Sequence, residues 1–377
     1  MKKIKICHIV NQITGKADGV FSHIKILLEG MDKNQFEQIV VFQGAPEVES
    51  ALKKLGIRYY VLDNLKKKFS LKLFFDFARI IRKENVQVIH SHLLKPYSIA
   101  GICNLFLKRK LIFNYHGYFI SNEYNSLFER AIYSFFNFII TRFNSLNLTL
   151  VPTNKLKSEV QRKIPSHKNI QAYYTGSSLK NQLKFDDEIR NRLMQIRQQY
   201  FLIGVLSRFE REKRTDIALE VSKTLIENGN NIFLVLFGDG RLENQLKVLS
   251  QRLKINESVY FAGYSGVVNN YLDLFDLLLI TSDREGFPMS IWEAMASSVP
   301  VVSSDVGGIS EVLKESNCGL VYERRNIPDA VAKIESLISD EKYRINLGEN
   351  GKEAIRIKYP LQNFISFMQK VYYGLAD

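Results

Sequence analysis

Residues 277–296 read LLLITSDREGFPMSIWEAMA, and this stretch carries the strongest structural signal in the sequence. Its start, residues 277–280, is short, apolar and uncharged, which is typical of a strand covered on both faces of a parallel sheet. Gly286 and Pro288 then indicate a turn that opens a helix, because proline is tolerated at the start of a helix. The stretch therefore predicts one strand–turn–helix unit of an α/β fold.

The same alternation of short apolar runs and helix-like segments continues along the chain in two series. We expect the strands of the first series at residues 4–10, 39–42, 59–62, 86–90, 111–115, 148–151 and 170–174. We expect those of the second series at residues 202–206, 232–237, 259–261, 277–280, 299–303 and 320–322. The pattern predicts two doubly wound, Rossmann-like parallel-sheet domains, whose ligands bind at the carboxyl ends of the strands.

A polar segment without an expected strand, residues 175–190, separates the two series. We place the linker there, and we expect an N-terminal domain over residues 1–178 and a C-terminal domain over residues 179–360. A chain of 377 residues is long enough for two such domains.

The composition excludes several classes of protein. With 46% hydrophobic and 24% charged residues, the chain is neither disordered nor fibrous. Its three cysteines, Cys7, Cys103 and Cys318, are far apart and odd in number, which indicates a reducing compartment and no disulfide framework. The first apolar run is shorter than a secretory signal, and residues 131–141, an uncharged apolar run near the middle, are too few to span a bilayer. We therefore expect a cytoplasmic protein.

The net charge of +13 is concentrated in the first half of the chain. Residues 1–180 contain 28 Lys and Arg against 12 Asp and Glu, whereas the remainder contains 24 against 27. A basic half can meet nucleic acid, an anionic membrane surface or a phosphorylated acceptor.

Charged and glycine-rich turns follow the expected strands of the second half. Arg208 and Lys213 flank a strand-to-helix turn, so both can converge on a diphosphate at the helix N-terminus. Gly238-Asp239-Gly240 forms a turn after the next strand. Residues 305–311 read DVGGISE and offer another glycine-rich helix start for phosphate contact. The cation pair and the turn at residues 305–311 predict a site for a diphosphate group.

Two carboxylates belong to the helix opening described above. Glu285 is expected in the loop and Glu293 about one and a half turns into the helix, so both line one wall of a cleft. Carboxylates accept hydrogen bonds from vicinal hydroxyls, so one can hold a sugar and the other a ribose. A retaining glycoside hydrolase also uses two carboxylates, but those flank the bond that breaks.

The first half contributes a glycine loop and histidines at strand ends. Residues 15–20 read GKADGV, which suits a phosphate or a closely approaching sugar and equally an ordinary turn. His90 and His92 alternate at the end of the fourth strand, but no third ligand with suitable spacing accompanies them, so we expect no metal site. We interpret His90 as a half-buried supporting residue. His116, beside Gly117 at the end of the fifth strand, is the better functional candidate.

These motifs resemble those of the family 4 retaining glycosyltransferases, which have the GT-B fold. The motifs occur in the family's order over nearly the whole chain. They are the first glycine loop, His116-Gly117, Arg208 with Lys213, Gly238-Asp239-Gly240, Glu285 and Glu293 with the EAMA tail, and Pro300-Val301-Val302 with the glycine pair that follows. The resemblance implies two domains that face each other across a cleft. It also implies that the last helices, residues 361–377, pack back on the N-terminal domain.

The resemblance implies roles for individual residues. Glu293 would bind the ribose of the donor, and Glu285 would bind the transferred sugar. Arg208 and Lys213 would neutralise the leaving diphosphate, and His116 would hydrogen-bond the sugar near the reacting centre. The other donor-binding residues would be Gly19, Gly238, Gly286, Phe287, Pro288 and Met289.

The chain departs from the family pattern at three places. Family members often carry a glycine pair where this chain has Asp18-Gly19, and often glycine where it has Arg214. In the linker, Asn-Gly-x-Asp is common where this chain has residues 175–178, TGSS.

The activity that the resemblance implies is transfer of a hexose from a nucleotide-diphosphate sugar with retained anomeric configuration. Neither a metal ion nor a cofactor is expected, because cationic side chains and helix N-termini stabilise the departing diphosphate. We expect a glycan or lipid-linked acceptor in the synthesis of a bacterial surface polysaccharide such as O-antigen or capsule. The alternatives are transfer to a soluble acceptor, a nucleotide-sugar epimerase of the same architecture, and a nucleic-acid-binding protein. No recognised nucleic-acid-binding motif supports the last.

Two basic, aromatic-rich segments motivate the lipid-linked acceptor. Lys66, Lys67 and Lys68 precede residues 69–82, which interleave phenylalanine and isoleucine with lysine and arginine, and a second aromatic segment follows at residues 128–143. Basic amphipathic helices lie in membrane interfaces, and each basic residue near an anionic surface contributes about 1 kcal/mol. Buried helices of a Rossmann-like domain give the same apolar pattern. Peripheral attachment to the inner membrane face is our hypothesis for the first half.

Overall fold

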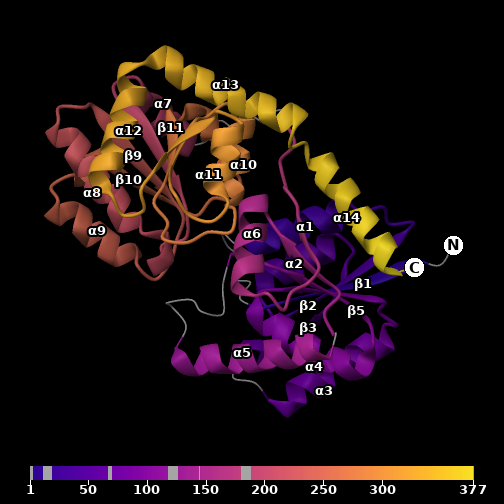
Figure 1. Ribbon diagram of the computed structural model, residues 1–377. Coiled ribbons are helices and arrows are strands. Elements are labelled where there is room, and N and C mark those ends of the chain that lie inside the picture. Colours follow the sequence, from indigo (N-terminus) through magenta and orange to yellow (C-terminus); the bar gives the residue numbers. More distant parts are fainter. Residues whose placement is uncertain are drawn as a thin grey trace. The chain divides into compact units, whose positions relative to one another are not determined.

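The chain forms two compact units, each with its own parallel sheet and core (Figure 1). The computed structural model describes residues 3–11, 19–66, 70–117, 126–143, 145–179 and 188–376. Unit 1 comprises Met1–Thr175 and Gln362–Asp377, and unit 2 comprises Gly176–Leu361. The predicted fold class, two doubly wound parallel-sheet domains, is confirmed.

The sheet of unit 1 has seven parallel strands in the order β3-β2-β1-β4-β5-β6-β7. They are β1 (Ile4–Val10), β2 (Phe36–Phe42), β3 (Arg58–Val61), β4 (Val88–His92), β5 (Lys110–Asn114), β6 (Leu148–Val151) and β7 (Ile170–Ala172). The strand order reverses between the paired neighbours β1 and β4. At such a reversal the loops that follow the two strands diverge, which leaves room for a ligand at the carboxyl ends.

Helices cover both faces of this sheet because its strands alternate their buried side chains between two core clusters. On one face Leu73, Phe77 and Ile81 pack against the strands, and on the other Phe21 and Leu28 do so. The helices are α1 (Gly19–Gly30), α2 (Pro46–Lys54), η1 (Asp63–Lys66), α3 (Leu71–Lys83), α4 (Leu94–Leu107), α5 (Leu127–Arg142), α6 (Asn154–Lys163) and, from the end of the chain, α14 (Leu361–Ala376). Helix α14 lies on the α1 face, where Phe364 packs against His23 at a ring separation of 5.1 Å.

The sheet of unit 2 has six parallel strands in the order β10-β9-β8-β11-β12-β13. They are β8 (Phe201–Leu206), β9 (Ile232–Phe237), β10 (Val259–Gly263), β11 (Leu277–Ile280), β12 (Val301–Ser304) and β13 (Gly319–Tyr322). Its helices are α7 (Glu188–Arg197), η2 (Arg211–Lys213), α8 (Thr215–Glu227), α9 (Glu243–Arg252), η3 (Asn256–Ser258), η4 (Val268–Asn270), η5 (Leu272–Leu274), α10 (Met289–Ala296), α11 (Ile309–Glu315), α12 (Ile327–Ser339) and α13 (Glu341–Ile357). The order reverses between β8 and β11, so the turns after these two strands share one edge of the sheet.

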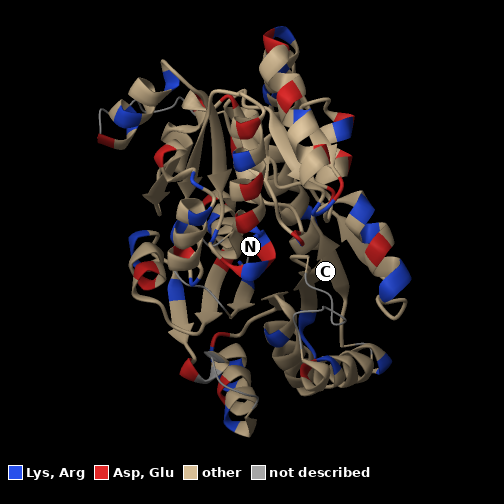
Figure 2. Ribbon diagram, turned by 90° about the vertical axis from the view of Figure 1, so that its left-hand side faces the viewer, with Lys and Arg blue, Asp and Glu red and all other residues tan. Residues whose placement is uncertain are grey.

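The burial of the strands explains why the sequence revealed them. Every residue of β4, β9, β11 and β12 is buried. In Figure 2 the strands are mostly free of charge, whereas Lys, Arg, Asp and Glu lie on the helices and loops. None of the helices in the described part of the chain is long and apolar enough to cross a bilayer.

All the predicted strands are present, but several of their ends differ from the prediction. Strand β2 begins at Phe36, three residues before the expected start, and β4 extends to His92 because its polar end is buried. Strand β12 begins at Val301, after Pro300, which has no N–H to donate to the sheet. Helix α7 begins at Glu188, within the last residues of the segment 175–190 where the linker was predicted.

Candidate active site

The predicted diphosphate cation and the predicted sugar carboxylate form an ion pair in unit 2. Lys213 ends η2, after β8, and Glu285 lies in the loop between β11 and α10. Lys213 Nζ lies 2.5 Å from Glu285 Oε1, and Ser282 Oγ donates to the same oxygen at 2.6 Å. The two charged side chains are only 17% and 10% exposed, so salt screens their attraction little. The fold thus brings together the two residues that the sequence selected.

Arg208, the second predicted cation, lies two residues after β8. Its Nη2 atom is 3.6 Å from Glu212 Oε1, and its side chain is 30% exposed. The turn that carries both cations is joined to the end of β11, since Thr281 Oγ1 donates to Lys213 O at 3.0 Å. This bond holds the backbone of Lys213 in place beside the loop that follows β11.

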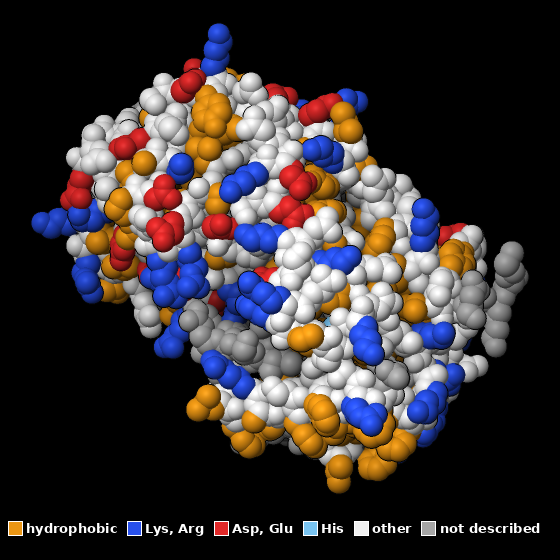
Figure 3. Space-filling view, in the orientation of Figure 1, with side chains coloured by type: hydrophobic (Ala, Val, Ile, Leu, Met, Phe, Trp, Pro, Cys, Tyr) orange, Lys and Arg blue, Asp and Glu red, His pale blue; other side chains and the backbone are white. Residues whose placement is uncertain are grey.

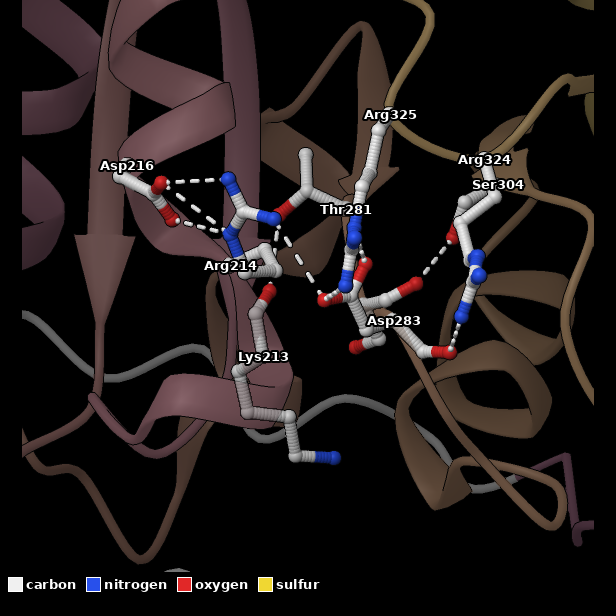
Figure 4. Close-up of polar contacts among 9 residues, drawn as sticks. Lys213, Arg214, Asp216, Thr281, Asp283, Ser304, Arg324 and Arg325 are labelled. Carbon is white, nitrogen blue, oxygen red and sulfur yellow. Dashed lines mark hydrogen bonds and ion pairs between the residues drawn. The ribbon is translucent and has the colours of Figure 1, made fainter. Parts of the chain in front are cut away.

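The structure shows the contacts that Arg214 makes at a position where family members often have glycine. Its backbone has a φ of 49°, in the left-handed region that glycine adopts without strain. The guanidinium forms two ion pairs, since Nη2 lies 2.8 Å from Asp216 Oδ2 and Nη1 lies 3.4 Å from Asp283 Oδ2 (Figure 4). Glycine could not form these pairs.

Asp283 is a buried carboxylate that joins three strand ends, and sequence reasoning did not select it. Its side chain is 1% exposed and accepts a hydrogen bond from Arg325 Nε at 2.8 Å, in addition to the pair with Arg214. Its backbone oxygen accepts from Arg324 Nη1 at 3.4 Å (Figure 4). Asp283 therefore ties the turn after β13 to the turns after β8 and β11, beside the Lys213–Glu285 pair.

Gly238, predicted to bind the donor, and Gly307, in the turn predicted for phosphate contact, permit close packing between these turns. Gly238 has a φ of 146°, and a Cβ atom there would lie 1.8 Å from Ser207 O. Gly307 has a φ of 56°, and a Cβ atom there would lie 2.2 Å from Glu285 O. A side chain at either position would displace the turn that carries Arg208 or the loop that carries Glu285.

The loop from Glu285 leads into α10 through the residues predicted to bind the donor. Gly286 O accepts a hydrogen bond from the glycine-rich start of α11. Pro288 is the N-cap residue and Met289 is the first residue of α10, so the predicted helix opening is present. Phe287 stacks on Trp292 with ring centroids 4.4 Å apart, which fixes the loop against its own helix.

Glu293, the predicted ribose ligand, lies in the second turn of α10 and is half-buried. Burial raises the pKa of its carboxyl to about 7, and a hydrogen bond from the Asn269 side chain opposes part of this rise. The carboxyl is therefore divided between its neutral and ionised forms at neutral pH, and its capacity to accept hydrogen bonds depends on pH.

Unit 1 holds the remaining predicted residues, His116 and Gly19. His116 follows β5 and precedes Gly117, whose φ of 91° requires glycine. The ring of His116 is half-buried, and burial lowers its pKa to about 4, so the ring is neutral at physiological pH. Gly19 begins α1, and a Cβ atom there would meet no heavy atom within 4 Å. The rest of the predicted glycine loop, residues 15–18, lies outside the described residues.

Histidines cluster on the α1 face of this sheet, and the expected burial of one of them is wrong. The pair His90 and His92 has a third histidine beside it, His8 of β1, and ring nitrogens of all three lie within 4.8 Å of one another. Spacing along the sequence could not reveal this neighbour because it comes from another strand. His90 is fully buried instead of half-buried, and its Nδ1 atom lies 2.8 Å from the hydroxyl of Tyr372 in α14.

Comparison with known proteins identifies the family. The family model of Glycosyltransferase Family 4 matches residues 17–179, and that of Glycosyl transferases group 1 matches residues 186–354. The chain is 25% identical over 314 residues to the N-acetyl-alpha-D-glucosaminyl L-malate synthase of Bacillus anthracis, covering 81% of this chain and 80% of that protein.

Two further similarities concern a shorter segment and the fold. Over 132 residues the chain is 32% identical to the N,N'-diacetylbacillosaminyl-diphospho-undecaprenol alpha-1,3-N-acetylgalactosaminyltransferase of Campylobacter jejuni. This segment covers 35% of this chain and 34% of that protein. The crystal structure of HepE from Anabaena in complex with UDP-glucose has a TM-score of 0.83 at 16% identity, and the match covers 98% of this chain and 100% of that chain. The chain belongs to the family 4 glycosyltransferases and has the GT-B fold.

Proposed function

We propose that this glycosyltransferase moves a hexose from a nucleoside diphosphate sugar to a lipid-linked sugar or glycan acceptor, with retention of anomeric configuration and without a metal ion. The acceptor belongs to the synthesis of a bacterial surface polysaccharide. The observation that carries the proposal is the half-buried ion pair of Lys213 and Glu285, with 2.5 Å between Nζ and Oε1; Lys213 lies on the turn that also carries Arg208.

This ion pair suits a site that exchanges partners when the donor binds. Without a donor, Glu285 neutralises Lys213. A donor diphosphate competes for Lys213 Nζ, and Glu285 then accepts a hydrogen bond from a hydroxyl of the transferred sugar. As the bond between the anomeric carbon and the diphosphate breaks, Lys213 and Arg208 stabilise the negative charge that develops on the leaving group. Two cations in fixed positions perform the task of a divalent metal ion.

The comparisons support the donor class and the stereochemistry. HepE was crystallised with UDP-glucose, which is a nucleoside diphosphate sugar. The names of both similar enzymes contain the word alpha for the sugar that they attach. Where the donor sugar is also α-linked, an α-linked product means that the configuration is retained.

The acceptor class is argued from an exposed apolar surface on unit 1, which we call the aromatic face. It lies on α3, α4 and α5, and Figure 3 shows hydrophobic side chains gathered along the lower edge of the view, over these helices. Its side chains are between 59% and 81% exposed, and they are Leu71, Phe75, Phe106, Leu127, Phe128, Phe135, Phe138 and Phe143. Folded monomers rarely leave such a large apolar patch in water, so the aromatic face indicates a binding surface.

A lipid surface fits the aromatic face better than a protein partner because basic residues accompany the phenylalanines. Lys72, Arg79 and Arg82 lie on α3, and Arg142 ends α5. Phenylalanine inserts at the boundary of headgroups and acyl chains, and lysine and arginine bind anionic headgroups. The Campylobacter jejuni enzyme is named for an acceptor that carries diphospho-undecaprenol, a lipid-linked group. The predicted basic residues Lys67 and Lys68 lie outside the described residues.

A soluble acceptor is the second candidate. The Bacillus anthracis enzyme, which matches most of this chain, is named for a product that contains L-malate. An acceptor of that kind leaves the aromatic face unexplained, so the two candidates differ in whether this surface binds lipid.

The proposal is tested by thermal unfolding with UDP, GDP, ADP and their sugars. A ligand at about 100 times its dissociation constant stabilises the folded protein by about 2.7 kcal/mol. We expect one nucleoside diphosphate series to raise the melting temperature of the wild type, and the Lys213→Met variant to lose most of this rise. The matched control is Lys223→Met, because Lys223 forms an exposed pair with Glu227 at the same distance, 2.5 Å. An equal rise in Lys213→Met and in wild type contradicts the proposal.

A further inference from the structure

A line of hydrogen-bonded side chains runs from the backbone of α1 across the sheet of unit 1 to His116. Gln38 of β2, His8 of β1 and His92 of β4 lie on the same face of the sheet, and all three are buried. Gln38 Oε1 lies 3.0 Å from His8 Nε2, and His8 Nδ1 lies 3.2 Å from His92 Nε2. His92 Nδ1 in turn lies 3.1 Å from His116 Nε2.

The hydrogen bond between Gln38 and Leu27 determines which atom donates and which accepts in the rest of this line. Gln38 Nε2 lies 3.1 Å from the backbone oxygen of Leu27, and a carbonyl oxygen only accepts hydrogen bonds. The amide nitrogen of Gln38 must therefore face Leu27, which leaves its oxygen to face His8. His8 Nε2 consequently carries the hydrogen and donates it to Gln38.

The remaining protons follow because each ring is neutral. Burial lowers the pKa of His8 and of His116 to about 4, and it lowers the pKa of His92 well below its ordinary value. A neutral imidazole has one N–H, so His8 Nδ1 is an acceptor and His92 Nε2 donates to it. His92 Nδ1 is then an acceptor as well, and His116 Nε2 donates to it. The amide nitrogen of Asn114, 3.4 Å from His92 Nδ1, also finds an acceptor there.

We propose that Gln38 is a positioning residue that, through His8 and His92, holds His116 in the Nε2–H tautomer and makes Nδ1 of His116 a hydrogen-bond acceptor toward the substrate. This inference rests on the proposed function and on the role that the family resemblance implies for His116, a hydrogen bond to the transferred sugar. An acceptor nitrogen binds a hydroxyl, which donates, and repels a carboxylate or a carbonyl oxygen. At the point where His116 touches it, the substrate is therefore a neutral sugar with a free hydroxyl, not a sugar acid.

A metal ion is the competing explanation of the histidine cluster, and it predicts the opposite tautomers. His8 Nδ1, His90 and His92 Nε2 are close enough to share an ion, and His90 Nε2 has no hydrogen-bond partner among the described residues. An ion bound at His92 Nε2 would move the ring proton to Nδ1. His92 would then donate to His116 Nε2, and the proton of His116 would lie on Nδ1.

The tautomers can be read directly by NMR of the full chain with ¹⁵N-labelled histidine, because two-bond nitrogen–proton correlations distinguish Nδ1–H from Nε2–H. We expect Nε2–H at His8, His92 and His116 in the wild type. Single His→Gln variants assign each signal of the spectrum to its histidine. Gln38→Met removes the acceptor, and His116 should then populate both tautomers. Gln38→Glu should keep the Nε2–H form, because a neutral carboxyl accepts from His8 and donates to Leu27 O.

The matched control is Gln87→Met, since Gln87 accepts a hydrogen bond from Lys5 N in the same unit and, among the described residues, is not hydrogen-bonded to a histidine of the line. In transfer assays Gln38→Met should lower kcat/KM about 5- to 10-fold, which corresponds to the loss of about one hydrogen bond. Gln38→Glu should recover most of the wild-type kcat/KM. Gln87→Met should change neither readout.

Three results would overturn the inference: Nδ1–H at His116 in the wild type, histidine spectra of Gln38→Met identical to those of the wild type, or metal bound at the cluster by elemental analysis. If Gln38→Met does not fold, the wild-type spectrum can still contradict the inference, through Nδ1–H at His116. The spectra need no substrate, so they also separate this inference from the proposed function. Full activity of His116→Ala with the expected tautomers would contradict only the role of His116 in transfer.

Discussion

Two residues of unit 2, Arg214 and Glu293, show which properties of a residue the family pattern predicts and which depend on the surrounding structure. Arg214 stands where relatives often have glycine, and its left-handed backbone explains that preference. At this position the arginine guanidinium forms ion pairs with Asp216 and Asp283, which a glycine could not form. Glu293 illustrates a second point, because its place on α10 was predictable, whereas the rise of its pKa to about 7 depends on the burial that the surrounding fold creates.

The raised pKa of Glu293 predicts opposite pH dependences for binding and for stability. Nucleotide affinity should increase as the pH rises through about 7, because the ionised carboxylate accepts hydrogen bonds from the ribose hydroxyls. The unliganded protein should lose stability over the same rise. The pKa of this carboxyl is about 7 in the folded protein and 4.5 in the unfolded chain, so the stabilising effect is full below 4.5 and is lost as the pH passes about 7.

Calorimetric titration with the nucleotide and urea unfolding, each between pH about 5 and about 8, measure these two trends. Glu293→Gln has no proton to lose, so both curves should become flatter in this variant. If the variant keeps the pH dependence of the wild type, another group is responsible and the ribose role of Glu293 loses its support.

At the scale of elements, strands were predictable and contacts between their ends were not. The apolar runs revealed the strands because nearly every residue of β9, β11 and β12 is buried. The apolar run of β4 stops before the strand does, because the buried residues at its end are histidine and serine, which carry no apolar signal. Partners distant in the sequence were also missed, such as Gln38 for His8, because register and strand order decide which side chains meet.

The Gly307 contact predicts a link between backbone packing and turnover. Gly307→Ala should destabilise the fold by more than about 2 kcal/mol, from a left-handed alanine and from a collision with Glu285 O, and it should lower kcat at least about tenfold by moving Glu285. Gly229→Ala is the matched control, because Gly229 has a φ of 86° and a Cβ atom there would meet nothing within 4 Å. Denaturant unfolding and transfer assays compare the two. Equal losses of stability with unchanged kcat would show that Gly307 does not support the Glu285 loop.

At the scale of the whole molecule, the two units carry different kinds of surface. Unit 1 has the aromatic face with its basic residues, and unit 2 has the ion pairs of Lys213 and of the buried Asp283. The uneven charge of the sequence hinted at this division, but only the structure separates exposed phenylalanines from those in the core. Phe77 and Phe75, for example, lie on the same helix, and the first is buried whereas the second is exposed.

The aromatic face predicts binding to anionic membranes. Wild-type protein should float with vesicles that contain phosphatidylglycerol and should bind neutral vesicles more weakly. Replacement of Phe75, Phe128, Phe135 and Phe138 by serine should abolish flotation without loss of stability, since these side chains are already in water. The control replaces Val248, Val267 and Ile345, which are exposed on unit 2. Unchanged flotation of the phenylalanine variant would favour the soluble acceptor.

The most direct test of the central claim is the configuration of the product formed in excess EDTA. With the donor selected by thermal unfolding and a simple acceptor, proton NMR reads the anomeric coupling of the new linkage. We predict that transfer continues in EDTA, because Arg208 and Lys213 stabilise the leaving diphosphate, and that the product has the anomeric configuration of the donor. An inverted linkage, or a loss of transfer that magnesium or manganese restores, would contradict the account.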